Sequence, residues 1–222
     1  MSYTWEFDRR TGHPLWRRVA RILVPVGARR RVGTWLGELG IDRRPDRIYL
    51  TRELIPAVAR RGGKLLFVGC RRYTKNYPAL FGAHGADCWT IDIDLSVARW
   101  GAPEQHVVGD LLDALDYWSP ATFDTIVLNG VFGFGLNAMR DQDAALRVCR
   151  RLLTADGRLI LGWNTDRCVD PSELSAVRSH YRPSSLSGLA RHQAFAKSAH
   201  VFDTFTVGDL VEPQVHFAGV QG

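Results

Sequence analysis

The chain has 222 residues, of which 45% are hydrophobic and 23% are charged. This composition excludes wholesale disorder, and the length suits one sizeable α/β domain but not two. The four cysteines show neither C-x-x-C spacing nor Cys/His clustering, so we expect reduced thiols and no metal site. No apolar run approaches the roughly 20 residues of a membrane span. The first ten residues lack the apolar core of a signal peptide, so a cytoplasmic protein is expected.

The positive charge is concentrated near the start of the chain. The net charge is +6, and the first 63 residues hold fourteen Arg, no Lys and six acids. Such a surface could serve a nucleic acid, an anionic membrane or an acidic substrate. The whole chain has only three Lys, which indicates a coding bias, and surface Arg also solvates helices without binding anything. Charge alone therefore decides little.

The N-terminal part of the chain is predicted to be helical. Apolar residues recur at helical spacing within residues 14–39, and residues 54–59 predict a short helix that Gly62 and Gly63 end. We expect residues 1–63 to form an N-terminal helical extension. Whether it is a lid, a dimer interface or part of the core stays open at this point. Residues 64–222 would form the main domain.

From residue 64 onward, apolar runs of strand length alternate with helical segments. The expected strands are residues 64–69, 88–94, 106–110, 123–130, 157–164 and 200–207. A helix between the fourth and fifth strands has Asp141 as its expected N-cap, and Asp170 caps a helix after the fifth. This alternation predicts an α/β fold with a mostly parallel sheet covered by helices.

Ligands bind parallel sheets beyond the carboxyl ends of the strands. Polar and small residues stand at these ends: Gly69, Cys70, Tyr73 and Thr74 after the first strand, Asp92 and Asp94 after the second, Asp110 after the third, Asn129 and Gly130 after the fourth, and Asn164 after the fifth. A carboxylate after the second strand is a usual acceptor for ribose hydroxyls. Asp92 and Asp94 share one face of the strand, so one could bind ribose while the other caps a helix.

Three glycines flank two aromatic residues directly after the fourth strand, in the run Gly-Val-Phe-Gly-Phe-Gly at residues 130–135. Such a run is a poor helix start. We expect it to let the backbone approach a ligand closely, with Phe132 and Phe134 as walls. It is not a phosphate-binding P-loop, because the Gly-Lys-Ser/Thr ending is missing.

Over residues 60–207 the chain resembles the class I S-adenosylmethionine-dependent methyltransferases. The resemblance rests on the glycine-ended first strand, the acid after the second, the Gly109-Asp110 pair, FDTIVLNGVFGFG and LLTADGRLILGWN. It implies a Rossmann-like sheet of seven strands with helices on both faces, in which residues 64–222 bind S-adenosylmethionine and release S-adenosylhomocysteine. HVFDTFTV looks like the antiparallel closing strand of that fold.

The resemblance also implies roles for single residues. Gly69 would underlie the methionine part of the cofactor, with Cys70, Tyr73 and Thr74 beside it. Asp94 would hold the ribose hydroxyls, with Asp92 second, and Asp110 would meet the adenine amino group. The remaining cofactor residues would be Leu111 beside the adenine ring, and Asn129 and Gly130 at the sulfonium. The first motif departs from the family, since Phe67 replaces the usual acid and Arg71 and Tyr73 replace later glycines.

The leading hypothesis is a methyltransferase acting on a small-molecule acceptor, which the front arginines would bias toward anionic compounds. Proton acceptors or orienting groups would be Tyr73, His106 and Asn164, with His200 more remote. No N-P-P-Y-type stretch follows the fourth strand, which disfavours a nucleic-acid base as acceptor. The oligomeric state stays open.

Three other functions are kept as alternatives. The first is an RNA or protein methyltransferase that docks through the Arg-rich region. The second is a protein that binds S-adenosylmethionine without methylating. The third, a nicotinamide-linked dehydrogenase, is disfavoured because G-x-G-x-x-G is absent after the first strand.

Overall fold

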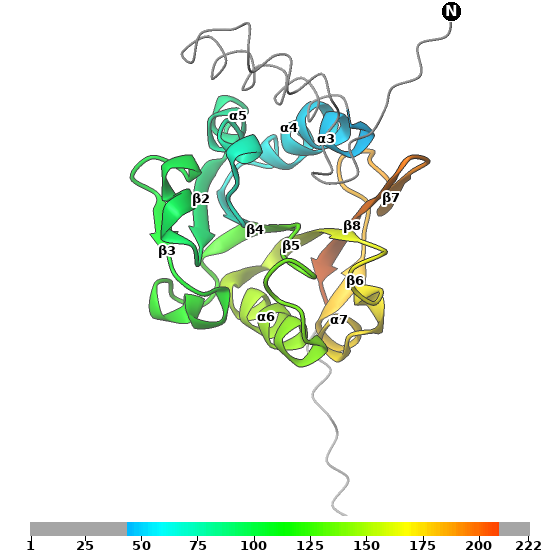
Figure 1. Ribbon diagram of the computed structural model, residues 1–222. Coiled ribbons are helices and arrows are strands. Elements are labelled where there is room, and N and C mark those ends of the chain that lie inside the picture. The colour runs from blue at the N-terminus through cyan, green and yellow to red at the C-terminus, as the bar shows by residue number, and fades with distance from the viewer. Residues whose placement is uncertain (1–43, 209–222) are drawn as a thin grey trace, which may run out of the picture. The chain divides into compact units, whose positions relative to one another are not determined.

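The computed structural model describes residues 44–208, and these form a sheet with helices on both faces (Figure 1). The strand order is β3-β2-β1-β4-β5-β8-β6, with β7 pairing with β8. Strands β1 to β5 are parallel, and β8 runs antiparallel to β5. The strands are β1 (Lys64–Val68), β2 (Asp87–Asp92), β3 (His106–Val108), β4 (Phe123–Asn129), β5 (Leu153–Asn164), β6 (Tyr181–Pro183), β7 (His192–Phe195) and β8 (Ser198–Val207).

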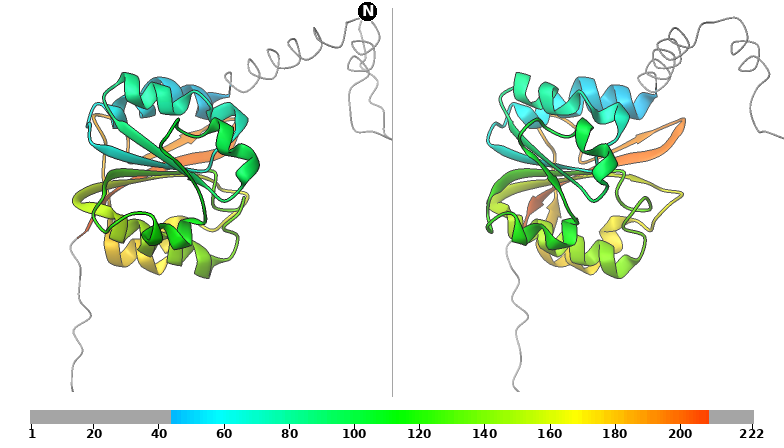
Figure 2. Two further views of the ribbon diagram at one scale, coloured as in Figure 1. Left: turned by 90° about the vertical axis from the view of Figure 1, so that its left-hand side faces the viewer. Right: turned by 60° about the vertical axis from the view of Figure 1, so that its left-hand side comes forward.

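The longer helices lie in two layers, with α3, α4 and α5 on one face of the sheet and α6 and α7 on the other (Figure 2). Their bounds are α3 (Pro45–Tyr49), α4 (Ile55–Ala59), α5 (Tyr77–Ala83), α6 (Met139–Leu152) and α7 (Ser175–His180). A π-helical turn, η1 (Leu50–Leu54), joins α3 to α4. The 3-10 helices are η2 (Arg72–Thr74), η3 (Leu95–Trp100), η4 (Leu111–Asp116) and η5 (Pro171–Glu173). No helix between residues 44 and 208 combines the length and the apolar character that crossing a bilayer would need.

The first helices belong to the core of the sheet domain. Leu50, Ile55 and Val58 are almost fully buried and share one apolar cluster with Leu65 and Phe67 of β1. A compact unit accordingly begins at Pro45, so the expected boundary at residue 63 falls inside a packed unit. The segment 14–39, on which the expected lid rested, lies outside the described residues.

The last strand, β8, pairs with two short strands that the sequence does not indicate. The seven-stranded order expected from the resemblance is present, and β7 adds an eighth strand, which pairs with β8 through Gln193 and Phe202. Neither β6 nor β7 was expected, because three or four residues are too few to show a period of two.

Helix α6 shows the expected apolar face but a different start. Ala145, Leu146 and Cys149 are fully buried against the sheet. The N-cap is Ala138, whose side chain makes no capping bond, and Asp141 lies inside the first turn. The expected cap at Asp141 is therefore wrong by three residues, although its carboxylate is still favourable near the helix start.

The order of the strands places a topological switch at β1. The chain goes from β1 outward to β2 and β3, and then returns to place β4 on the other side of β1. Backbone pairs join Val68 of β1 to Ile91 of β2 and to Leu128 of β4. The carboxyl ends of these three strands therefore lie side by side, which is where open parallel sheets bind ligands.

Candidate functional site

Gly69 ends β1 in a conformation that suits glycine. Its φ is +92°, and a Cβ there would lie 3.2 Å from Cγ2 of Val131 and 3.4 Å from the carbonyl oxygen of Asn129. Its N–H donates to the carbonyl of Ile91 at 3.0 Å. Glycine at this position therefore supplies the positive φ and lets Val131 and Asn129 pack against the backbone of the switch point.

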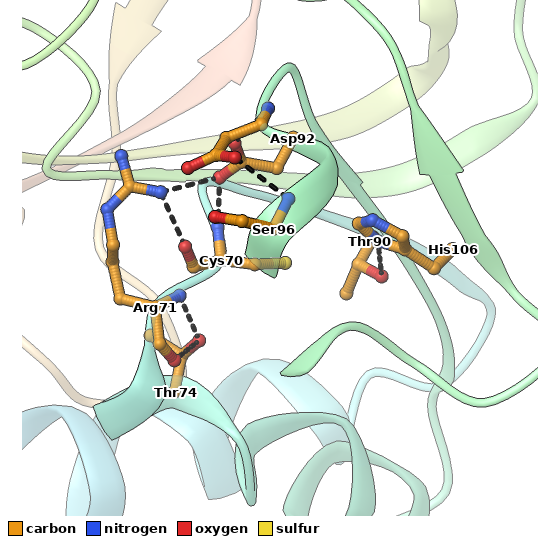
Figure 3. A network of polar contacts seen from close by, with 8 residues as sticks. Cys70, Arg71, Thr74, Thr90, Asp92, Ser96 and His106 are labelled. Atoms are coloured by element: carbon orange, nitrogen blue, oxygen red, sulfur yellow. Dashed lines mark hydrogen bonds and ion pairs between the residues drawn. The ribbon is translucent and has the colours of Figure 1, made fainter. Parts of the chain in front are cut away.

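Asp92 is the centre of a buried network rather than a free acceptor (Figure 3). Its Oδ2 accepts hydrogen bonds from the backbone N–H of Cys70 at 2.6 Å and from Nη1 of Arg71 at 3.0 Å. Its Oδ1 accepts from the backbone N–H of Asp94 at 2.9 Å. Burial, followed by the Asp92 charge, raises the pKa of the Cys70 thiol to about 11. Asp92 therefore ties β1 to β2, and Cys70 is a neutral thiol.

Asp94 is the exposed carboxylate of the pair. Its Oδ1 accepts from the backbone N–H of Ser96 at 2.8 Å and so caps η3. Hydrogen bonds from Ser96 lower the pKa of Asp94, and the nearby positive charge of Arg71 lowers it further. The neighbouring Ile93 and Leu95 are 70% and 74% exposed. A charged acceptor beside two uncovered apolar side chains suits a sugar attached to a flat apolar ring.

Asp110 follows β3 and lies at the same edge, because Val108 pairs with Asp92. Its Oδ1 accepts from the backbone N–H of Leu112 at 2.9 Å and caps η4. Leu111 is 5% exposed and belongs to the core, whereas Val108 is 41% exposed. Val108 therefore offers more uncovered apolar surface at this edge than Leu111, the residue selected from the sequence.

A buried polar cluster joins the ends of β4 and β5 to β8. Nδ1 of His200 lies 2.7 Å from Oδ1 of Asn164, and its Nε2 lies 3.2 Å from Oδ1 of Asn129. Burial, helped by the charge of Arg47, lowers the pKa of His200 to about 4, while Asp46 opposes the shift. The imidazole is therefore neutral at pH 7, and a neutral imidazole donates from only one nitrogen.

The single donor of the neutral His200 ring limits the hydrogen bonds that Asn129 can make. Its Nδ2 is buried and has no hydrogen-bond partner within the described part of the chain. Because His200 cannot donate to both amide oxygens, one side of the Asn129 amide stays unsatisfied in either orientation. Gly162 allows this packing, since a Cβ there would lie 2.5 Å from Oδ1 of Asn129. Asn129 therefore retains hydrogen-bonding capacity at the carboxyl end of β4.

Tyr73 and Thr74 differ in what their side chains do. The guanidinium of Arg47 lies over the Tyr73 ring, 3.8 Å from its centroid. The Thr74 hydroxyl accepts from the backbone N–H of Arg71 at 3.0 Å and donates to the Arg71 carbonyl at 2.9 Å. Thr74 thus stabilises η2. Tyr73 presents a ring beside a cation.

His106 does not lie with the other candidates. It begins β3, two residues before the carboxyl end, and its Nδ1 lies 2.9 Å from Oγ1 of Thr90. Its ring packs against Gly101, where a Cβ would lie only 2.3 Å from Nδ1. Burial lowers the pKa of His106. This placement argues against the catalytic role expected for it.

The glycine run after β4 has a different explanation from the one expected. Phe132 is 3% exposed and belongs to the core, so it is not a wall of a ligand site. Gly133 has a φ of +77° and lies against Arg167, whose Cβ would be 2.7 Å from an added Cβ. Phe134 is exposed, with the Arg167 guanidinium 5.1 Å from its ring centroid. Only Gly130, with a φ of +65°, faces open space.

The structure thus brings the strand-end residues to one edge and adds four that the sequence does not single out, namely Val108, Leu95, Arg71 and Arg47. Leu95 could have been predicted as an exposed apolar residue of the site, because it follows Asp94 directly and begins the helix that Asp94 caps. Arg71 stood out only as a departure from the glycine pattern. Arg47 gave no signal among fourteen front arginines, since only the packing of α3 places it over Tyr73.

No family model and no curated protein matches the sequence. Solved structures do match the fold. A TehB-like SAM-dependent methyltransferase from Corynebacterium glutamicum is 26% identical, with 83% of this chain and 100% of that chain covered and a TM-score of 0.58. The N-methyltransferase NodS from Bradyrhizobium japonicum, crystallised with S-adenosylhomocysteine, is 16% identical, with 76% and 91% covered and a TM-score of 0.59.

A third similar structure is the Burkholderia thailandensis 1,6-didemethyltoxoflavin-N1-methyltransferase, crystallised with its acceptor and S-adenosylhomocysteine. It is 17% identical, with 85% of this chain and 94% of that chain covered and a TM-score of 0.51. The strand order, the acid after β2 and these three likenesses agree with the motifs read along the sequence. The chain has the fold of the class I S-adenosylmethionine-dependent methyltransferases.

Proposed function

We propose that this methyltransferase transfers a methyl group to a small-molecule acceptor that carries an anionic group. The observation that carries the proposal is the row of strand ends at the switch point. There the glycine turn at Gly69 and the exposed carboxylate of Asp94 stand on one side, and the unsatisfied amide of Asn129 stands on the other.

The residues at this edge fit S-adenosylmethionine. Asp94 remains ionised at neutral pH and could accept both ribose hydroxyls. Leu95 and Val108 offer exposed apolar surface for the adenine, and Asp110 offers a carboxylate for its amino group. Gly69 and Gly130 let the backbone approach the methionine part. Asp92 and Thr74 would act indirectly, by holding the loop after β1.

When bound, S-adenosylmethionine supplies a methyl group on a positively charged sulfur. The chain's main task is then to align an acceptor atom with that methyl. Asn129 and Asn164, fixed by the neutral His200, would orient the acceptor through hydrogen bonds. With a pKa of about 4, His200 is a weak base at pH 7. Its proposed role is therefore to position the two amides.

Arg47 supports the anionic character of the acceptor. Its guanidinium is held over Tyr73, and its Nε and Nη1 are buried without a hydrogen-bond partner among residues 44–208. Asp46 lies beside it, with 3.5 Å between Nε and Oδ2. A buried guanidinium with unused donors favours a carboxylate or phosphate. The charge of Arg47 also lowers the pKa of His200, which supports an acceptor side that both residues border.

Thermal denaturation with S-adenosylhomocysteine tests the proposed cofactor. A ligand that binds only the folded chain stabilises it by about 2.7 kcal/mol at a hundredfold excess over its Kd. We expect a clear rise in Tm with S-adenosylhomocysteine and none with NAD at the same concentration. No rise at millimolar S-adenosylhomocysteine would contradict the proposed function, and a rise with NAD alone would favour a dehydrogenase.

An Arg47→Met variant tests the proposed acceptor class. The probe is a panel of small carboxylic acids, each paired with its neutral methyl ester, added to protein saturated with S-adenosylhomocysteine. We expect further stabilisation by some acids and not by their esters, and its loss in Arg47→Met with unchanged cofactor binding. Equal shifts with acids and esters, or shifts that persist in the variant, would refute an anionic acceptor held by Arg47.

A further inference from the structure

We propose that Arg71 binds the carboxylate of the methionine part of S-adenosylmethionine. Arg71 stands at a position of the loop after β1 where the resembling family has a glycine. The inference rests on the proposed function. It names a binding group for one end of the cofactor, at a position where the sequence departs from the family pattern.

The backbone explains why an arginine can stand there. Arg71 has φ −146° and ψ 164°, an extended conformation open to any residue, and it caps η2. The positive φ in this loop falls on Gly69 instead. A long side chain at position 71 therefore adds no backbone strain, and it projects from the carboxyl end of β1, at the topological switch.

One half of the guanidinium is already held by the protein. Nη1 donates to the carbonyl of Cys70 at 2.6 Å and to Oδ2 of Asp92 at 3.0 Å. Figure 3 shows this nitrogen between the two acceptors, with the rest of the guanidinium turned away from Asp92. Asp92 is in turn fixed by the N–H groups of Cys70 and Asp94. The planar group is therefore oriented before any ligand arrives, which lowers the entropy lost on binding.

The other half remains available. Nε and Nη2 make no hydrogen bond or ion pair within residues 44–208, and the Arg71 side chain is 45% exposed. These two nitrogens form the side-on edge of a guanidinium, whose parallel N–H groups match the two oxygens of a carboxylate. A bidentate carboxylate is thus the ligand that this edge fits best.

The surroundings favour the cofactor over the acceptor as the source of that carboxylate. The charge of Arg71 reaches Asp94, the proposed ribose acid, and lowers its pKa. The two groups therefore lie close enough to serve one molecule. Two residues before Gly69, where the resembling family has an acid, this chain has Phe67. The Phe67 ring is buried and packs against Tyr77, with 5.7 Å between the ring centroids. Among the charged side chains of this loop, Arg71 is the one for which the structure shows an oriented guanidinium with an available edge at the end of β1.

Calorimetric titration of the full chain with three ligands tests the inference. S-adenosylhomocysteine carries the carboxylate, its decarboxylated analogue keeps only the amine, and 5′-methylthioadenosine lacks the whole amino-acid tail. We expect Arg71→Met to weaken S-adenosylhomocysteine at least tenfold and to change the other two less than about threefold. Arg71→Lys, which keeps the charge without the planar fork, should fall between. Arg140→Met removes the same charge from an exposed position and should bind all three ligands like the wild type.

Retained binding of 5′-methylthioadenosine shows that Arg71→Met is folded. The inference is overturned if the variant binds S-adenosylhomocysteine like the wild type. It is also overturned if all three ligands weaken together, which would mean that Arg71 acts through Asp92 on the whole loop. If the wild type binds none of the three at millimolar concentration, the proposed function itself fails, and the inference fails with it.

Discussion

Replacing Asp92 by alanine is expected to lower the free energy of unfolding by on the order of 3 kcal/mol, because one buried and one partly buried backbone N–H group lose their acceptor. These belong to Cys70 and Asp94, and the partly exposed pair with Arg71 adds little. Urea denaturation measures the loss. Asp92→Asn keeps an acceptor oxygen and should lose less.

Replacing Asp94 should have the opposite profile. Asp94 is exposed and caps only the short η3, so Asp94→Ala should unfold at nearly the same urea concentration as the wild type. Its Kd for S-adenosylhomocysteine should rise about tenfold to a hundredfold, because the proposed charged acceptor of the two ribose hydroxyls is gone. If instead Asp92→Ala keeps full stability and loses the ligand, while Asp94→Ala binds normally, the assignment of the two acids is reversed.

The second large effect concerns His200 and pH. Its pKa falls from an ordinary 6.5 to about 4 in the folded chain, chiefly because it is buried. Between these values the unfolded chain binds a proton that the folded chain does not, so stability falls as the pH drops from 6.5 to 4. The loss from this group is on the order of 3 kcal/mol.

A titration of stability in the wild type and in His200→Gln isolates this contribution. Other groups also titrate on the way to pH 4, and their effect cancels in the difference between the two proteins. The wild type should lose more stability than the variant by on the order of 3 kcal/mol between pH 7 and pH 4. Parallel curves would mean that His200 is protonated in the folded chain, against the burial and the Arg47 charge that surround it.

Hydrophobic patterning was enough to predict the sheet and its edge. The apolar runs at β1, β4 and β5 are buried on both faces, as parallel strands require. Since parallel strands end at one edge, Gly69, Asp94, Asp110 and Asn129 could be grouped from their positions alone. The three residues of β6 and the four of β7 leave no such pattern, so the sequence predicts the closing strand β8 without these two partners.

The roles of the single residues at this edge could not be assigned from the sequence, because they depend on where each side chain points. Asp92 and Asp94 look alike in sequence. Only its burial and the three hydrogen bonds that it accepts distinguish Asp92 from the exposed Asp94. His106 begins β3, as the expected strand 106–110 has it, so its distance from the carboxyl end of that strand can be predicted from the sequence. Phe132 and Phe134 flank one glycine, yet one is core and the other exposed. Contacts between segments far apart in the chain, such as Arg47 of α3 over Tyr73 of η2, leave no trace in local sequence.

A crystal structure of the full chain with S-adenosylhomocysteine tests the central claim most directly. We predict that the ribose hydroxyls lie on the carboxylate of Asp94, the adenine lies against Leu95, and the sulfur faces the end of β4 at Asn129. Electron density for the ligand away from the carboxyl ends of β1, β2 and β4 would contradict it, as would a ribose held by Asp92 with Asp94 turned to solvent.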